Sequence, residues 1–241
     1  MQTPSGAVYT EADLDLLRAM HRVGFVKYSD EPFKLKSGIM SNVYVFGRED
    51  FTDNPDFADR LGRKLADVVY ANIFDERQPC LIGLPTAGTG LAAAASQASL
   101  YMSRERPLVE MDLRPLIAYR IMREQLKAHG SGQHRGTWVN GRPDLLRHQY
   151  WIVDNVATDG KTKIENAPRL IEDGYPAHQM PVLICVDRQQ GAIKRLRDEG
   201  FERIHVAYEL LDITFAFGEM DLWPKSAVAA VEEEIRQHQF V

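Results

Sequence analysis

Short apolar segments alternate with amphipathic helical segments along most of the 241-residue chain. The apolar runs are strand-like and end in polar loops, and the segments between them carry apolar residues at helical spacing. Strands that are joined through helices pair in parallel, through right-handed crossovers. The alternation therefore predicts an α/β fold in which a mainly parallel central sheet is flanked by helices.

Individual elements follow from the same pattern and from helix-start signals. Thr10 with Asp13 forms a capping-box pattern, and Asn54 with Pro55 predicts a second helix that begins with an Asn cap. Between these two helices, short strands are expected at 25–30, 33–38 and 41–46. Further strands are expected at 79–85, 107–112, 116–122, 150–156, 180–188 and 203–210, and helices at 10–24, 54–74, 89–103, 161–174, 191–200 and 226–240.

The composition narrows the function classes. Hydrophobic residues make up 44% of the chain and the net charge is −5, which argues against a broad nucleic-acid surface rich in Lys and Arg. Cys80 and Cys185 lie in apolar runs without other ligands at metal spacing, so we expect buried core thiols. No signal-like segment and no long apolar run is present. We therefore expect a cytoplasmic protein without nucleic-acid or membrane partners.

The segment at about 123–143 departs from the alternation. It contains four glycines, several basic residues and little apolar periodicity. At about 20 residues it is longer than most connections in a compact domain, and such loops often carry function. We expect a mobile loop here.

The stretch 151–162, WIVDNVATDGKT, brings polar side chains to the end of an expected strand. In open α/β sheets, ligands bind beyond the carboxyl ends of strands, and the free N–H groups at a helix start favour an anion. Asp154 and Asn155 suit hydrogen bonds with a vicinal diol, and the small residues at 158–162 suit a phosphate. The predicted ligand therefore carries a phosphate and a ribose-like diol.

Two other interpretations apply to the same stretch. Gly160–Thr162 reads GKT, as in the P-loop of nucleotide triphosphatases, but Asn155 stands where that motif needs Gly. A polar strand-to-helix turn that binds no ligand stays open when this stretch is taken alone.

Five stretches together resemble a known family. The stretch 151–162 is similar to the ribose-phosphate loop of type I phosphoribosyltransferases, and four others resemble the orotate phosphoribosyltransferases among them. In chain order these four are FVKYSDEPFKLKSGIMSNVYV (25–45), LIGLPTAGTGLAAAAS (81–96), RIMREQLKAHGSG (120–132) and CVDRQQGAIKRLRDEGF (185–201). In that family they form the N-terminal hood, the pyrophosphate loop, the mobile catalytic loop and the Asp-Arg-x-Gln-Gly segment.

The resemblance implies a type I phosphoribosyltransferase fold with a small N-terminal hood. Residues 1–50 would form the N-terminal helix and the hood, and residues 51–241 the core with its mobile loop. It also implies an activity, the transfer of ribose 5-phosphate from phosphoribosyl pyrophosphate (PRPP) to orotate in pyrimidine nucleotide synthesis. The products are orotidine 5′-monophosphate and pyrophosphate. Because the family's catalytic loop reaches the neighbouring subunit, a homodimer that shares loop 123–143 is expected.

The chemistry of this transfer explains the residue types that the resemblance implies. A cation develops at ribose C1 and negative charge on the leaving group, so cations around the pyrophosphate and exclusion of water are needed. The cofactor is Mg²⁺, expected to bind mainly through PRPP near Asp154, and no protein residue is assigned as a direct ligand. Catalytic roles fall to Lys127, His129, Asp154 and Arg123. The implied substrate-binding residues are Lys36, Arg188, Asn155, Ala157, Thr158, Asp159, Gly160, Lys161, Thr162, Thr86, Ala87, Gly88 and Thr89.

Three of these assignments compete with plainer ones. Lys36, expected near orotate and pyrophosphate, is otherwise an exposed turn lysine. Arg188, expected to hold the orotate carboxylate through two parallel hydrogen bonds, is otherwise part of an ordinary surface salt bridge. His129, expected to hydrogen-bond or protonate the leaving group, is otherwise a solvated loop residue.

The chain also departs from the family pattern at four positions. Asn155 replaces the second acid of the ribose pair, and Asp159 stands where the phosphate loop usually has a hydroxyl residue. Glu124 and Ala87 stand where many members carry Lys. These departures keep two alternatives open: a non-catalytic protein that senses PRPP or a nucleotide, and a phosphoribosyltransferase for another base.

Overall fold

A parallel five-stranded sheet forms the centre of the molecule. The computed structural model describes residues 1–35, 38–45, 48–105, 114–123 and 142–238. The strand order is β4-β3-β5-β6-β7, and each neighbouring pair is parallel, as the alternating pattern predicted. The strands are β3 (Gln78–Gly83), β4 (Ala118–Ile121), β5 (His148–Ala157), β6 (Val182–Asp187) and β7 (Ile204–Glu209).

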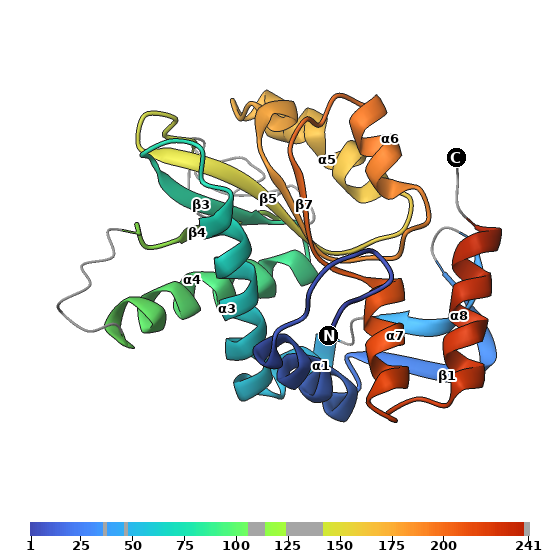
Figure 1. The fold of residues 1–241 in the computed structure, drawn as a ribbon. Coiled ribbons are helices and arrows are strands. Elements are labelled where there is room, and N and C mark those ends of the chain that lie inside the picture. The colour runs from blue at the N-terminus through green and yellow to red at the C-terminus, as the bar shows by residue number, and fades with distance from the viewer. Residues whose placement is uncertain (36–37, 46–47, 106–113, 124–141, 239–241) are drawn as a thin grey trace.

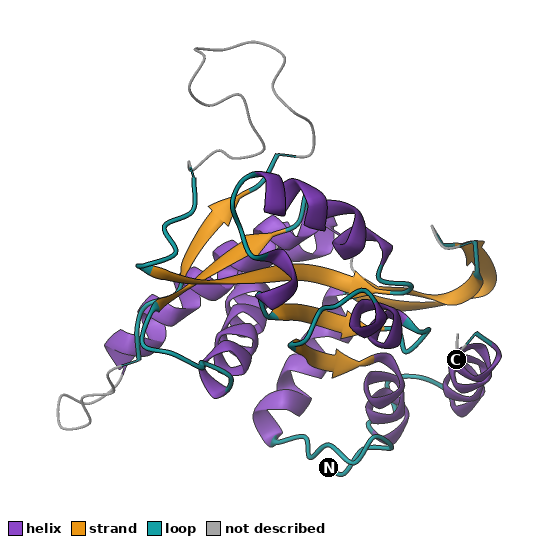
Figure 2. Ribbon diagram, turned by 90° about the horizontal axis from the view of Figure 1, so that it is seen from above, coloured by secondary structure: helices purple, strands orange, loops and turns teal. Residues whose placement is uncertain are grey.

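Helices cover both faces of this sheet (Figures 1 and 2). On one face lie α3 (Pro55–Ala71) and α4 (Ala87–Glu105), which pack on each other and on the strands. On the other face lie α5 (Lys161–Glu172) and α6 (Ala192–Asp198), with the short 3₁₀ turn η1 (Ala177–Gln179). The layered arrangement has the carboxyl ends of all five strands at one edge.

A second, two-stranded sheet lies beside the main one (Figure 1). It consists of the antiparallel strands β1 (Val26–Lys34) and β2 (Met40–Val45), which we call the hood hairpin. Two C-terminal helices, α7 (Leu210–Glu219) and α8 (Lys225–Gln237), pack on each other, and α8 contacts β2. Elements from both ends of the chain therefore meet around the hood hairpin.

The first helix begins as its sequence signals predict. In α1 (Glu11–Val23) the Thr10 hydroxyl accepts a hydrogen bond from the Asp13 N–H, and the Asp13 carboxylate accepts one from the Thr10 N–H. This is the reciprocal capping box. Asp13 also forms a 2.6 Å ion pair with Lys64 of α3, so the cap links two helices.

Several local predictions were wrong or incomplete. Helix α3 begins after Asn54, but the Asn54 side chain makes no capping bond and donates instead to the Asp50 carbonyl. The strand predicted at 25–30 and the start of the one at 33–38 form a single strand, β1, with an irregular register. Helices α2 (Arg48–Thr52) and α7 were not predicted. The strand predicted at 107–112 lies outside the described residues.

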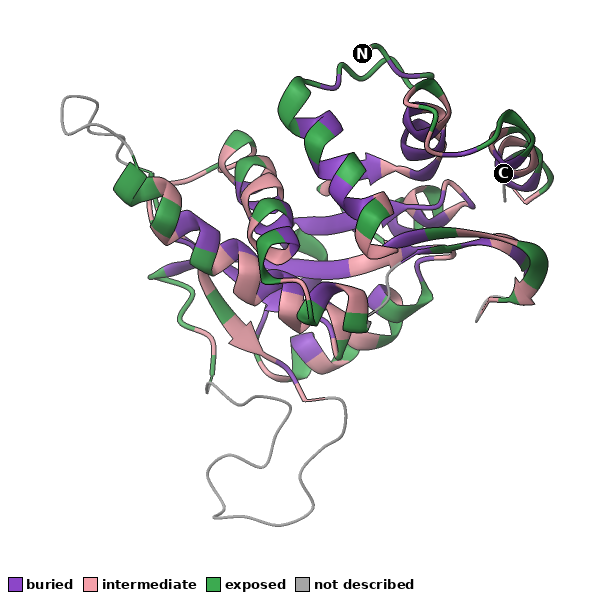
Figure 3. Cartoon of the chain, turned by 90° about the horizontal axis from the view of Figure 1, so that it is seen from below, coloured by how far each residue is buried: buried purple, intermediate pink, exposed green. Residues whose placement is uncertain are grey.

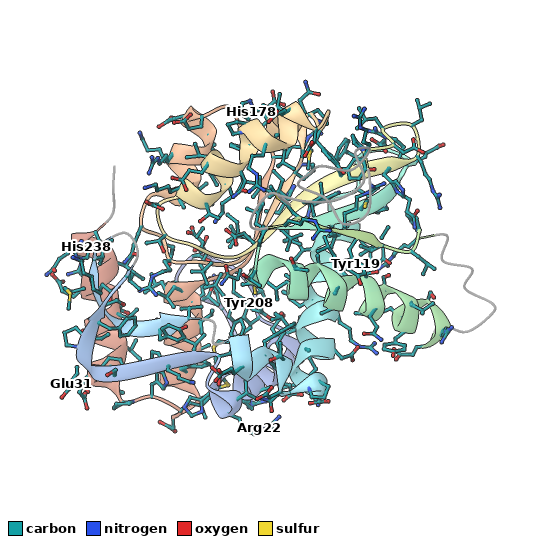
Figure 4. The ribbon with its side chains drawn as sticks, turned by 180° about the vertical axis from the view of Figure 1, so that it is seen from behind. Arg22, Glu31, Tyr119, His178, Tyr208 and His238 are labelled. Atoms are coloured by element: carbon teal, nitrogen blue, oxygen red, sulfur yellow. The ribbon has the colours of Figure 1, made fainter. Side chains whose placement is uncertain are left out.

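The core lies between the sheet and its helices, and the three inner strands β3, β5 and β6 are its most buried strands (Figure 3). Cys80 and Cys185 are buried free thiols, as predicted. Tyr208 of β7 is buried at the centre of Figure 4, and its hydroxyl lies 3.2 Å from the Asp13 carboxylate. Within the described residues, no helix combines the length and the hydropathy that a membrane-spanning segment requires.

Candidate active site

A polar pocket of about 280 Å³ opens at the carboxyl ends of β3 and β5. Three segments that are distant in the sequence form it: the hood hairpin, the turn after β3, and the end of β5 with the loop that follows. Its lining residues are Leu35, Tyr44, Val45, Pro85, Thr86, Ala87, Asp154, Asn155, Val156, Thr158, Asp159, Gly160, Lys161, Thr162 and Lys163. The pocket therefore unites most of the positions predicted to contact ribose, phosphate and pyrophosphate.

A larger groove of about 840 Å³ lies between α1, α3 and β7, away from these strand ends. Asp13 and Lys64 line it, and they are already paired with each other across the two helices. We place the candidate active site in the smaller pocket, because ligands of open α/β folds bind beyond the carboxyl ends of the strands.

The loop from β5 to α5 turns at Gly160. Its φ of 73° is in the left-handed region, which favours glycine. A Cβ at this position would lie 3.2 Å from Leu196 and 3.3 Å from the Ala192 carbonyl oxygen. The glycine was predicted to let the backbone approach a phosphate; the structure adds that α6 closes the other side of the loop. The N-terminus of α5 is thereby presented to the pocket.

The Asp159 carboxylate, in the loop predicted to bind a phosphate, has partners within the protein. Its carboxylate accepts a 3.1 Å hydrogen bond from the Lys161 N–H and lies 3.6 Å from the Arg195 guanidinium. One N–H group at the start of α5 is therefore already used by a side chain of the protein. The repulsion expected between Asp159 and a phosphate is reduced because this carboxylate is turned toward the helix and Arg195.

Asp154 is buried and held from two sides. One carboxylate oxygen accepts a 2.9 Å hydrogen bond from the Asn155 N–H, and the other pairs with the Lys163 ammonium at 2.5 Å. Lys163 also donates to the Val156 carbonyl at 3.2 Å. Both Asp154 and Lys163 line the pocket, so an ion pair forms part of its floor.

A second buried carboxyl group lies behind this pair. Asp187, at the end of β6, is 5% exposed and accepts a 3.1 Å hydrogen bond from the Gln189 N–H. Burial raises the pKa of Asp187 to about 6, while that hydrogen bond and the positive charge of Lys163 act in the opposite direction. Lys163 therefore interacts electrostatically with two buried acids.

Arg188 follows Asp187 but does not line the pocket. Its guanidinium is buried and donates to Glu234 at 2.8 Å, to the Ser41 hydroxyl at 2.7 Å and to the Val43 carbonyl at 2.8 Å. Gln190 donates to the same Glu234 oxygen at 3.0 Å. The plainer interpretation of Arg188, a surface salt bridge, is thus half correct, since the salt bridge exists but is internal. Its predicted contact with a substrate carboxylate stays a prediction.

Three predicted positions support the pocket from behind. The Ala157 carbonyl accepts a 2.9 Å bond from the Arg188 N–H. Gly88 lies so close to β5 that a Cβ would clash with the Val153 carbonyl oxygen, and Thr89 donates to the Gly83 carbonyl at 3.4 Å. Gly88 and Thr89 thus hold the start of α4 against β3 and β5, and none of the three positions is among the lining residues.

Four predictions fall on the hood and the long loop. Lys36, Lys127 and His129 lie outside the described residues, as does Glu124. Arg123 is described, and its carbonyl accepts a 2.9 Å hydrogen bond from Arg169 of α5. The roles proposed for these side chains therefore stay predictions, although Leu35, next to Lys36 in the sequence, lines the pocket.

Sequence reasoning missed Lys163 and Asp187. The signal for Lys163 was its spacing, because Lys163, Ala167 and Leu170 are the buried positions of α5, three and four residues apart. A lysine on the apolar face of a helix needs a buried partner, and the preceding strand offered Asp154. For Asp187 the only signal in the sequence was its position at the end of a predicted strand, next to Arg188.

The pocket side chains fit a Mg²⁺ ion that binds together with the substrate. Those that the structure describes do not form a metal site made of protein ligands alone. Both oxygens of Asp154 already have protein partners, and its neighbour is the neutral Asn155. Within the part of the chain that the structure describes, no group of three His, Cys, Asp or Glu side chains could hold a metal. Mg²⁺ commonly binds through substrate phosphates with few protein ligands.

Comparisons with known proteins confirm the resemblance found in the motifs. No family model matches the chain. A curated relative, the orotate phosphoribosyltransferase of Pyrococcus abyssi (strain GE5 / Orsay), is 26% identical over 189 residues, which cover 78% of this chain and 88% of that protein.

Solved structures share the fold. The Leishmania donovani UMP synthase matches with a TM-score of 0.68 at 21% identity, over 94% of this chain and 42% of that one, so this chain spans less than half of that protein. The Francisella tularensis orotate phosphoribosyltransferase matches with a TM-score of 0.65 at 16% identity, over 96% and 99% of the two chains. The Mycobacterium tuberculosis H37Rv orotate phosphoribosyltransferase in complex with PRPP matches with a TM-score of 0.52 at 17% identity, over 84% and 98%. The chain has the type I phosphoribosyltransferase fold.

Proposed function

We propose that this chain is an orotate phosphoribosyltransferase, which transfers ribose 5-phosphate from PRPP to orotate in pyrimidine nucleotide synthesis. The observation that carries the proposal is the single pocket in which Asp154 and Asn155 lie beside the start of α5 and the turn at 85–87. These are acceptors for a diol, donors for a phosphate and a backbone turn for a pyrophosphate, arranged at one sheet edge. The similarity to orotate phosphoribosyltransferases supports orotate as the acceptor.

Different pocket residues bind different parts of PRPP. Asp154 and Asn155 accept hydrogen bonds from the two ribose hydroxyls. The hydroxyls of Thr158 and Thr162 and the backbone N–H groups at the start of α5 bind the 5′-phosphate. The turn with Thr86 and Ala87 binds the pyrophosphate, which extends away from C1.

The reaction breaks the bond between ribose C1 and the pyrophosphate oxygen and forms a bond between C1 and a ring nitrogen of orotate. The pyrophosphate leaves with the bonding electron pair, and the ring nitrogen of orotate forms the new bond with its lone pair and releases its N–H proton to solvent. Lys127 and Arg123 balance the charge that develops on the leaving group, and His129 donates a hydrogen bond or a proton to it. Asp154 faces the positive charge that develops on the sugar.

Orotate binding involves Lys36 and Arg188. Because the Arg188 guanidinium donates to Glu234, a substrate carboxylate that binds there has to exchange with the Glu234 carboxylate. Asn155 lowers the number of acids beside the ribose from two to one, so Asp154 is the only acid of that pair.

Mg²⁺ belongs to the proposal as a partner of PRPP. When bound, it neutralises charge on the pyrophosphate. Excess EDTA is expected to abolish turnover and added Mg²⁺ to restore it, whereas EDTA alone leaves the thermal unfolding midpoint of the protein without PRPP unchanged. A large drop of that midpoint in EDTA would contradict a substrate-borne ion.

We further propose a homodimer in the cytoplasm. The dimer follows from the family resemblance, in which the loop matched by 123–143 serves the neighbouring subunit. Two free thiols among the described residues, at Cys80 and Cys185, suit a reducing compartment. Sedimentation of the purified chain, and mixing of two inactive variants in Asp154 and Lys127, test the shared loop, because mixed dimers regain one intact site.

Ultraviolet absorbance tests the activity. Purified protein is mixed with Mg²⁺, PRPP and, separately, orotate, uracil, hypoxanthine and guanine. Consumption of orotate alone is the expected result. Binding of PRPP without consumption of any base would instead support the non-catalytic sensor, and consumption of another base would redefine the acceptor.

A further inference from the structure

The Lys163 ammonium lies in an unusual place for a lysine. Its side chain is 2% exposed and belongs to the first turn of α5. Burial disfavours a charge, and a cation at a helix N-terminus also faces the positive end of the helix dipole. Both effects oppose Lys163, so its charge must be offset by nearby acids.

Two acids, Asp154 and Asp187, offset the positive charge of Lys163, and Asp154 does so in direct contact. Asp154 pairs with the Lys163 Nζ atom at 2.5 Å, and the Val156 carbonyl accepts a second hydrogen bond at 3.2 Å. Asp187 interacts with Lys163 at longer range. Because buried ion pairs often stabilise a fold no more than apolar residues of the same size, stability alone does not explain this lysine.

The position of the pair points to a role in the pocket. Lys163 and Asp154 both line it, together with Asp159 of the loop and Lys161, the first residue of α5. Asp187 has the same 5% exposure as Asp154 but no ion pair at contact distance, and its pKa is raised to about 6 by burial. The direct contact with Lys163 is therefore what distinguishes Asp154 from the neighbouring buried acid.

We propose that Lys163 is a positioning residue that keeps the Asp154 carboxylate charged and in one orientation for the ribose hydroxyls of PRPP. The inference rests on the proposed function in taking PRPP as the ligand. It adds a role for a buried cation that none of the predicted site residues supplies. Lys163 acts through Asp154 and does not itself touch the reacting atoms.

The experiment compares Lys163→Met with Asp154→Asn and with the double variant. PRPP dissociation constants and kcat/KM are measured from about pH 6 to about pH 9, the range over which a displaced carboxyl pKa is seen. Lys194→Met is the matched control, because this exposed lysine of α6 also has an aspartate partner but lies outside the pocket. Lys163→Gln keeps a hydrogen-bond donor without the charge and replaces Lys163→Met if the latter fails to fold.

The sign of the pH effect follows from the groups that face Asp154. Lys163 of α5 and the Asn155 N–H contact the carboxylate, Asp159 of the loop and Lys161 at the start of α5 line the same pocket, and Asp187 at the end of β6 interacts with Lys163. Without Lys163, the burial of Asp154 disfavours a charge that has lost its counter-ion, so the neutral carboxyl group is favoured. Raising the pH then restores the carboxylate and with it PRPP binding.

We expect Lys163→Met to lower kcat/KM for PRPP by about tenfold or more near neutral pH, with the loss shrinking as the pH rises. The double variant should match Asp154→Asn within about twofold, because both changes remove the same function. The same series in an Asp187→Asn background removes the titration of Asp187. A loss that is equal at every pH, or effects that add in the double variant, would overturn the proposal. Failure of the wild-type protein to bind PRPP would instead overturn the proposed function.

Discussion

The Arg188 guanidinium donates a 2.8 Å hydrogen bond to the Glu234 carboxylate across 46 residues of sequence. The contact joins the end of β6 to α8. The Ser41 hydroxyl of β2 binds the same carboxylate at 2.9 Å, and the Val43 carbonyl accepts a bond from Arg188. One ionic network therefore connects the central sheet, the hood hairpin and the last helix.

Glu234→Ala is expected to lower the free energy of unfolding by about 3–5 kcal/mol, because it leaves Arg188 buried without its counter-charge. Urea denaturation measures the change. Glu233→Ala is the matched control, since this neighbouring glutamate of α8 is half exposed and accepts hydrogen bonds from Arg236 and Gln237 of the same helix. The control should change stability by less than about 0.5 kcal/mol. Equal effects of the two substitutions would contradict the network.

The raised pKa of Asp187 predicts a pH dependence of stability. With a folded-state pKa of about 6, the folded protein holds a proton that the unfolded chain has already released. Stability therefore falls as the pH rises from about 4 to about 6, by roughly 3 kcal/mol from this group. Asp187→Asn should lack this fall, so the variant gains stability relative to the wild type as the pH increases.

Urea denaturation at several pH values checks the Asp187 prediction. Asp198→Asn serves as the control, because that carboxylate is exposed on α6. Stability curves of Asp187→Asn and wild type that run parallel between about pH 4 and about pH 6 would rule out the proposed titration.

Gly160→Ala should destabilise the protein by more than Gly200→Ala. Both glycines have positive φ, at 73° and 88°, so alanine is strained at each by about 1–2 kcal/mol. At Gly160 a Cβ also meets Leu196 and the Ala192 carbonyl, whereas nothing lies within 4 Å at Gly200. The difference between the two losses in urea denaturation isolates the contact with α6. Gly160→Ala should also weaken PRPP binding, and Gly200→Ala should not.

Lys127→Ala is expected to lower kcat by about 10²–10³-fold, because it removes a cation from the developing charge on pyrophosphate. Steady-state kinetics with PRPP and orotate measure the loss, and thermal unfolding checks that the fold is retained. Full activity of the variant would show that the loop residue is wrongly assigned.

The fold was largely predictable because it depends on local patterns. The alternation of apolar runs and amphipathic segments identified β3, β5, β6 and β7 and the helices between them. Helix α7 was missed because its residues are apolar on most sides, and such a segment carries no amphipathic stripe. The prediction that Asn54 caps α3 was wrong because the Asn54 side chain donates to a different partner, the Asp50 carbonyl.

The candidate site was predictable where consecutive residues form it. The stretch from Asp154 to Thr162 forms the last residues of β5, the loop that follows and the start of α5, and the structure joins it to Thr86 and Ala87 in one pocket. Arg188 shows the limit of this reasoning. Its position after β6 was evident, but the direction of its side chain depends on Glu234 and Ser41.

The sequence by itself determined the alternation of strands and helices in the main sheet and the polar loop after β5, since these depend on periodicity and on residues close together in the chain. Only the tertiary structure decided the ionic partners, with Lys163 on Asp154 and Glu234 on Arg188. The physical reason is that periodicity tells which face of an element is buried, whereas the charge that a buried group meets there depends on how separate elements pack.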